Sequence, residues 1–117
     1  MLQYPPQTLN ALHNHPRGSE LLYIVQGVLD VGLINSTNKL FSQALHEGDL
    51  FVFRKGLVHF QTNRDMQQTM KAVPGFSTSN PGLILLPPTL SDSKYPDVVM
   101  DKSFGVSTDT VKNLKGL

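Results

Sequence analysis

The chain has 117 residues, of which 39% are apolar and 16% are charged, and its formal net charge is +1. This length suits one domain with a modest core, and the lack of clustered lysine and arginine argues against nucleic acid as the partner. No apolar run reaches the length of a membrane span, and because the chain contains no cysteine, disulfides and thiolate metal sites are excluded.

The first twelve residues are predicted to form a segment at the edge of a sheet. Pro5 and Pro6 cannot donate hydrogen bonds to a neighbouring strand, so they belong at an edge or a bend. The first six residues have neither a basic start nor an apolar stretch, and we therefore expect no signal peptide at this start. Residues 16–19 have the composition of a turn.

The residues on either side of this turn carry side chains that bind metals. His13 and His15 are two positions apart, so on an extended strand both point to the same side. Glu20 reaches the same place if the next strand folds back, and His59 follows a turn of its own downstream. Imidazole and carboxylate groups bind divalent transition metals. The sequence therefore predicts one metal site formed by His13, His15, Glu20 and His59, and ligand chemistry alone admits manganese, iron, zinc or nickel.

The middle of the chain predicts a series of short strands separated by turns. These strands cover residues 21–25, 28–34, 40–45, 50–53, 57–61, 69–74 and 83–86. The first of them is apolar on both faces, which indicates a sheet covered on one side by a barrel interior and on the other by another sheet or subunit. His46 falls in a turn and is expected to be exposed.

The pattern changes from strand to helix near the C-terminus. Residues 96–104 predict a short helix that ends before Gly105. Ser107 suits the N-cap of a second helix, whose apolar stripe consists of Val111 and Leu114.

Two helices with so little apolar surface are not stable alone. We therefore expect a β-barrel domain in residues 1–92 and a helical extension in residues 93–117 that packs on the barrel or on a neighbouring subunit.

Five motifs resemble the germin-like proteins of plants, which are members of the cupin superfamily. They are HPRGSELLY at 15–23, GDLFVF at 48–53, GLVHFQ at 56–61, SNPG at 79–82 and KSFGV at 102–106. The resemblance implies an all-β fold, a jelly-roll β-barrel of two antiparallel sheets around a small cavity, with a short C-terminal helical extension. Members of this family carry a signal peptide, a cysteine pair and further strands ahead of this region, so we expect that part to be missing and the barrel to be incomplete.

The resemblance also implies the metal and the reaction. Manganese would be held by the four predicted ligands, and the activity would be that of a superoxide dismutase or an oxalate oxidase, both of which produce hydrogen peroxide. Asn10 matches an asparagine that positions oxalate in the oxidases. A second such asparagine would fall ahead of Met1, which favours superoxide over oxalate as the substrate. The family further implies a homo-oligomer, a hexamer, in the extracellular apoplast or cell wall.

Four residues depart from the family pattern, and none of these departures removes a predicted ligand. Gln7 replaces a glycine, Arg54 replaces a proline, and Ala11 and Leu12 replace a pair of prolines. Two alternatives remain open on the sequence. One is a cupin without enzymatic activity that binds small carboxylates or serves as a seed reserve, and the other is an inactive truncated fragment whose site does not form.

Overall fold

The computed structural model describes residues 1–91 and 94–116. The chain forms two compact units, Met1–Ile84 and Leu85–Leu117. The boundary predicted at residues 92–93 lies outside the described residues, so the division into a barrel domain and a helical extension stays a prediction.

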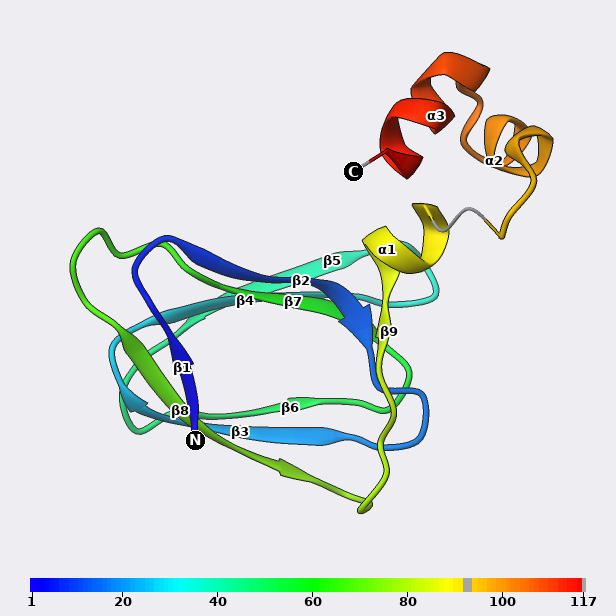
Figure 1. Ribbon diagram of the computed structural model, residues 1–117. Coiled ribbons are helices and arrows are strands. Elements are labelled where there is room, and N and C mark those ends of the chain that lie inside the picture. Colours follow the sequence, from blue (N-terminus) through cyan, green and yellow to red (C-terminus); the bar gives the residue numbers. More distant parts are fainter. Residues whose placement is uncertain (92–93, 117) are drawn as a thin grey trace. The chain divides into compact units, whose positions relative to one another are not determined.

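Within the described residues, nine strands form two antiparallel sheets, and the predicted all-β fold is confirmed. One sheet has the order β1-β8-β3-β6 and the other has the order β5-β4-β7-β2-β9. The eight strands from β1 to β8 lie in two facing layers (Figure 1). Their bounds are Leu2–Tyr4 for β1, Thr8–Asn14 for β2, Glu20–Gln26 for β3, Leu29–Ile34 for β4, Leu40–Leu45 for β5, Leu50–Phe53 for β6, Val58–Asn63 for β7, Met70–Phe76 for β8 and Ile84–Leu85 for β9.

The core fills the space between the two layers. Along β3, Leu22 and Ile24 are fully buried, and residues from both sheets complete the cluster. This alternation is the period of two that an extended strand imposes. The other core members are Leu29, Val31, Leu45, Phe53, Met70 and Ala72.

The outer face of the four-stranded sheet is apolar and exposed. It carries Leu21 and Tyr23 on β3, Leu50 and Val52 on β6, and Val73 on β8. Among the described residues no second sheet covers this face, so the expected cover by another sheet is not found there, and its cover by a neighbouring subunit stays a prediction.

The strand predicted for residues 83–86 is shorter than expected. β9 ends at Leu85, and helix α1 (Leu86–Ser91) begins at the next residue. Pro87 and Pro88 end the sheet, as predicted, but they do so inside the first turn of a helix. Proline is tolerated there, because the amide groups of a first turn have no partner within the helix.

The two predicted C-terminal helices are confirmed as α2 (Asp97–Phe104) and α3 (Thr108–Lys115). Gly105 ends α2 in the left-handed conformation, with φ of 64°, and the Ser107 side chain caps α3 by accepting from the Thr110 amide. Val111 is buried as expected, whereas Leu114 is exposed. None of the helices in the described ranges has the length and apolar character needed to span a membrane.

Candidate metal centre

Three elements bring the four predicted ligands together. His13 on β2 lies directly opposite His59 on β7, its neighbour in the five-stranded sheet. Glu20 is the first residue of β3 in the facing sheet. His15 lies just beyond the end of β2, which stops at Asn14. The sequence predicted both histidines on one extended strand, and only His13 lies on it.

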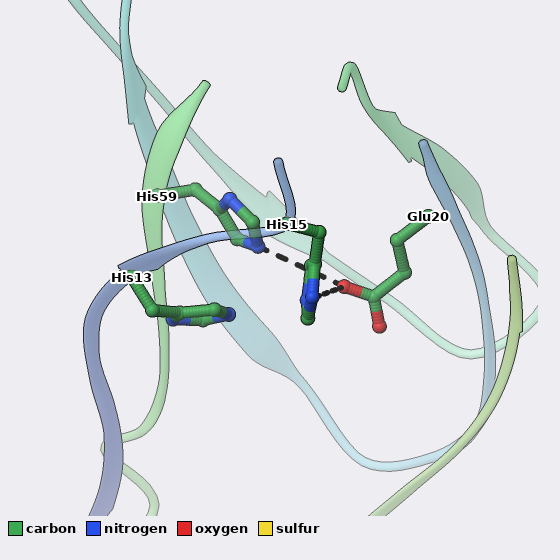
Figure 2. Close-up of side chains that lie close together, drawn as sticks. All are labelled: His13, His15, Glu20 and His59. Atoms are coloured by element: carbon green, nitrogen blue, oxygen red, sulfur yellow. Dashed lines mark ion pairs between the residues drawn. The ribbon is translucent and has the colours of Figure 1, made fainter. Parts of the chain in front are cut away.

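The ligand atoms of these side chains form a tight group that could hold a metal ion. All four lie within 4.8 Å of one another. Glu20 Oε1 is 3.5 Å from His15 Nε2 and 3.7 Å from His59 Nε2, and Figure 2 shows both imidazoles directed at this carboxylate. Whether these residues bind a metal stays a prediction.

The backbone fixes which nitrogen of each imidazole faces the group. The Nδ1 atoms lie 2.6 Å from Ala11 O for His13, 2.7 Å from Gly82 O for His15 and 2.8 Å from Leu57 O for His59. A carbonyl oxygen only accepts hydrogen bonds, so each Nδ1 carries the proton. The neutral ring then keeps its lone pair on Nε2, which is the arrangement that a metal-binding histidine needs.

Burial keeps these groups away from water and leaves two of them without partners. His13 and His59 are each 1% exposed and Glu20 is 3% exposed. Glu20 Oε1 and His59 Nε2 have no hydrogen-bond partner. A buried carboxylate oxygen and a buried lone pair that lack donors are costly unless a cation neutralises them. The donor set and its orphaned atoms therefore fit a divalent metal ion.

The electrostatics of His13 agree with a neutral ligand. Burial lowers its pKa most, and the positive charge that His59 and His15 would carry lowers it further. The Ala11 carbonyl and the Glu20 carboxylate act in the opposite direction. The net effect is a lowered pKa of His13, so the imidazole is neutral at neutral pH. Its Nε2 atom then carries no proton that would compete with a metal.

Aromatic rings form the wall next to the histidines. Phe53 stacks on His59 with ring centroids 4.3 Å apart and an interplanar angle of 19°. Phe76 meets His15 edge to face at 5.0 Å. These ring contacts restrict the orientation of the two imidazoles.

Asn10 and Gln61 lie next to this group, and Tyr4 joins them. Asn10 Nδ2 donates to Gln61 Oε1 at 2.8 Å and to the Tyr4 hydroxyl at 3.3 Å. The sequence analysis singled out Asn10 through a family resemblance. It missed Tyr4, because the position of that side chain depends on the pairing of β1 with β8, for which the sequence carries no signal.

The fourth histidine takes no part in the group. The side chain of His46 is 67% exposed, as predicted, and its Nδ1 lies 4.0 Å from Asp49 in the same turn. This residue offers an internal control for any experiment on the other three.

Comparison with known proteins identifies the family. Residues 1–112 match the cupin family. The chain is 46% identical to germin-like protein 9-3 of Oryza sativa subsp. japonica, over 98% of the chain and 53% of that protein. It is 39% identical to the rhicadhesin receptor of Pisum sativum, over 97% of the chain and 53% of that protein. The chain thus spans about half the length of the curated relatives it matches.

Solved structures agree with this assignment. Oxalate oxidase superposes with a TM-score of 0.91 at 34% identity, over 97% of this chain and 59% of that one. Oxalate decarboxylase from Bacillus subtilis superposes with a TM-score of 0.83 at 25% identity, over 96% of this chain and 29% of that one. The predicted jelly-roll fold and the resemblance to germin-like proteins are confirmed by these matches. The chain belongs to the cupin family.

Proposed function

We propose that His13, His15, Glu20 and His59 hold one divalent metal ion and that this ion is manganese. The observation that carries the proposal is the group of three imidazoles and one carboxylate whose ligand atoms all lie within 4.8 Å of one another. His13, Glu20 and His59 are buried, His15 is partly buried, and Glu20 Oε1 and His59 Nε2 lack partners. Imidazole with one carboxylate suits manganese or iron. The choice of manganese follows from the similarity to germin-like proteins.

The reaction we propose is a redox conversion of a small oxygen-bearing anion that yields hydrogen peroxide. When bound, the ion supplies open coordination positions and a change of oxidation state. Three neutral imidazoles and one carboxylate leave a divalent ion with net positive charge, which attracts an anion into the pocket. Phe53 and Phe76 keep the histidines in place through their ring contacts.

Superoxide and oxalate are the two candidate substrates. Dismutation of superoxide needs no group that orients the substrate, and both amide hydrogens of Asn10 are already engaged by Gln61 and Tyr4. Oxidation of oxalate by dioxygen, to carbon dioxide and hydrogen peroxide, is supported by the similarity to oxalate oxidase structures, one of which holds the substrate analogue glycolate.

Assays of the purified chain with and without added manganese test this proposal. We expect metal-dependent activity toward one of the two substrates, and its loss in His59→Ala. Tight binding of a small carboxylate without turnover would instead support a binding or storage protein. No activity and no metal under either condition would support an inactive fragment.

Two further parts of the proposal concern the protein's setting. We propose an extracellular location and a homo-oligomer, a hexamer, by similarity to the germin-like family. The exposed apolar face formed by Leu21, Tyr23, Leu50, Val52 and Val73 supports the association of subunits.

A further inference from the structure

Two segments that cross between the sheets run side by side next to the candidate metal centre. Residues 15–19 lead from β2 of the five-stranded sheet to β3 of the four-stranded sheet. Residues 77–83, which we call the strap, lead from β8 back to β9 in the five-stranded sheet (Figure 1). The first of these segments carries His15, so whatever holds the two segments together also affects this predicted ligand.

Hydrogen bonds join the strap to the first segment along its length. Ser19 O accepts from the Ser77 amide at 3.0 Å, and the Ser19 amide donates to Ser77 Oγ at 2.9 Å. Two residues earlier, the Arg17 amide donates to Pro81 O at 2.9 Å. The strap is therefore held at both of its ends by the segment that begins with His15.

His15 differs from the other two imidazoles of the centre in the origin of its Nδ1 partner. The carbonyl groups that accept from His13 and His59 belong to residues two positions earlier in the chain. The carbonyl that accepts from His15 is that of Gly82 on the strap, 67 residues away. His15 also lies outside the strands, and its side chain is 13% exposed, compared with 1% for His59. The orientation of this one imidazole thus depends on the strap.

The Arg17 side chain fixes the part of the strap that presents this carbonyl. Its Nε donates to Asn80 O and its Nη2 donates to Asn80 Oδ1, both at 3.0 Å. Together with its amide, Arg17 makes three hydrogen bonds to the two residues that precede Gly82. The guanidinium also lies against Gly82, because a Cβ atom there would come within 2.7 Å of Arg17 Nη2. Gly82 has a φ of 73°, a conformation that glycine adopts without strain.

The Gly82 carbonyl determines what His15 presents to the centre. A neutral imidazole carries its proton on either nitrogen, and the hydrogen bond of one nitrogen selects the state of the other. With Nδ1 donating to Gly82 O, the Nε2 atom of His15 has a lone pair. If the carbonyl moved away, the proton could shift to Nε2, and the ring would direct a donor instead of a lone pair at the centre.

We propose that Arg17 is a positioning residue for the metal centre. Through the strap it holds the Gly82 carbonyl against His15 Nδ1, so that His15 Nε2 faces the centre without a proton. The inference rests on the proposed metal site, since it concerns the orientation of one of the four ligands. It also explains why this end of the strap needs a glycine beside the guanidinium.

The experiment combines NMR of the metal-free chain with manganese titration by calorimetry. Nitrogen-15 spectra of histidine-labelled protein at about pH 8, above the ordinary pKa of imidazole, show which ring nitrogen carries the proton. Arg17→Lys keeps the positive charge but loses the planar fork that bonds two oxygens, and Arg17→Gln loses both. Arg64→Gln is the matched control, because it removes an exposed arginine whose hydrogen bond goes to Asp30 on β4.

We expect His15 to carry its proton on Nδ1 in wild type and in Arg64→Gln, and to be a mixture of both tautomers in the two Arg17 variants. His13 and His59 should keep the proton on Nδ1 in every protein, because their carbonyl partners are local. A general loss of structure would instead change all three imidazoles. The Kd for manganese should rise about tenfold in both Arg17 variants, as is typical when the partner of a metal-bound histidine is lost.

Three results would overturn the inference. An unchanged His15 tautomer in both Arg17 variants refutes the positioning role. A normal tautomer and Kd in Arg17→Lys, with defects only in Arg17→Gln, assigns the effect to charge. A mixed tautomer with an unchanged manganese Kd shows that this orientation does not govern binding. If wild type takes up no manganese, the proposed function fails, and the tautomer comparison, which needs no metal, still decides whether Arg17 orients His15.

Discussion

His59 and Glu20 belong to opposite sheets, yet His59 Nε2 and Glu20 Oε1 are 3.7 Å apart in the buried interior, and neither atom has a hydrogen-bond partner. β7 and β3, which carry them, share no backbone hydrogen bonds. A cation between these two side chains would connect the two layers of the sandwich. Metal binding and the stability of the fold should therefore be linked.

Addition of manganese is expected to raise the unfolding temperature of the chain. A ligand at a concentration of 100 times its Kd stabilises the folded state by about 2.7 kcal/mol. Glu20→Gln removes the carboxylate with little change of shape and should abolish most of this effect, whereas Asp49→Asn, at an exposed turn, should preserve it. Thermal unfolding followed by circular dichroism measures both. An equal rise in wild type and Glu20→Gln would show that the ion binds elsewhere.

Gly32→Ala is expected to destabilise the five-stranded sheet. A Cβ atom at this position of β4 would overlap the ring of Phe60 on the neighbouring strand β7. Overpacking of this kind costs about 1–3 kcal/mol in the free energy of unfolding. Gly75→Ala on β8 is the matched control, because its Cβ would meet no atom within 4 Å. Urea unfolding compares the two, and equal stability of Gly32→Ala and wild type would contradict the close packing of Phe60.

The substitution Val52→Lys on the outer face of the four-stranded sheet is expected to reduce the mass of the oligomer in solution. Val52 lies on the edge strand β6, opposite Leu21 on β3, and is one of the exposed apolar residues of this face, so burying an unpaired charge there would oppose association. Leu9→Lys, at an exposed position of the other sheet, serves as the control. Light scattering coupled to gel filtration gives the mass. If Val52→Lys and wild type have the same mass while wild type is oligomeric, this face is not the interface.

Acid is expected to weaken the pairing of α2 with α3. The hydrogen bond from Lys115 Nζ, 2.6 Å from Asp97 Oδ1, lowers the pKa of Asp97 below its ordinary value of 3.8. A group whose pKa is lower in the folded state stabilises that state above its unfolded value, and this contribution disappears as the pH falls through the lowered pKa. An NMR titration of the Asp97 carboxyl group checks this.

Lys115→Met should raise the pKa of Asp97 toward its ordinary value, because the hydrogen bond from Lys115 is the largest cause of the lowering. Lys102→Met, in the last turn of α2, removes a lysine that does not contact Asp97 and should leave this pKa lowered. An Asp97 pKa that is the same in wild type and Lys115→Met would show that the pair does not form in solution.

Much of the fold could be predicted from local sequence patterns. The alternation of Leu22 and Ile24 with Leu21 and Tyr23 marks β3, since a strand has a side-chain period of two. Gly105 and Ser107 mark the boundary between α2 and α3, because one supplies the left-handed conformation and the other the capping oxygen. Helix α1 was not predicted, since Pro87 and Pro88 break a strand and also suit a first helical turn, and composition does not decide between these roles.

The candidate site could be predicted only in part. The spacing of His13 and His15 and the turn before Glu20 suggest a metal site, because those features are local. The approach of His59 depends on the pairing of β2 with β7, and that of Tyr4 on the pairing of β1 with β8. Such pairings join residues far apart in the sequence, and a single sequence contains no direct signal for them. A family resemblance supplied the first pairing but not the second.

Manganese content per chain after native purification tests the central claim most directly, with wild type, His59→Ala and His46→Ala compared side by side. We expect close to one ion per chain in wild type and in His46→Ala, whose imidazole is exposed and outside the group, and little or none in His59→Ala. The absence of metal from wild type, or an equal content in all three proteins, would contradict the account.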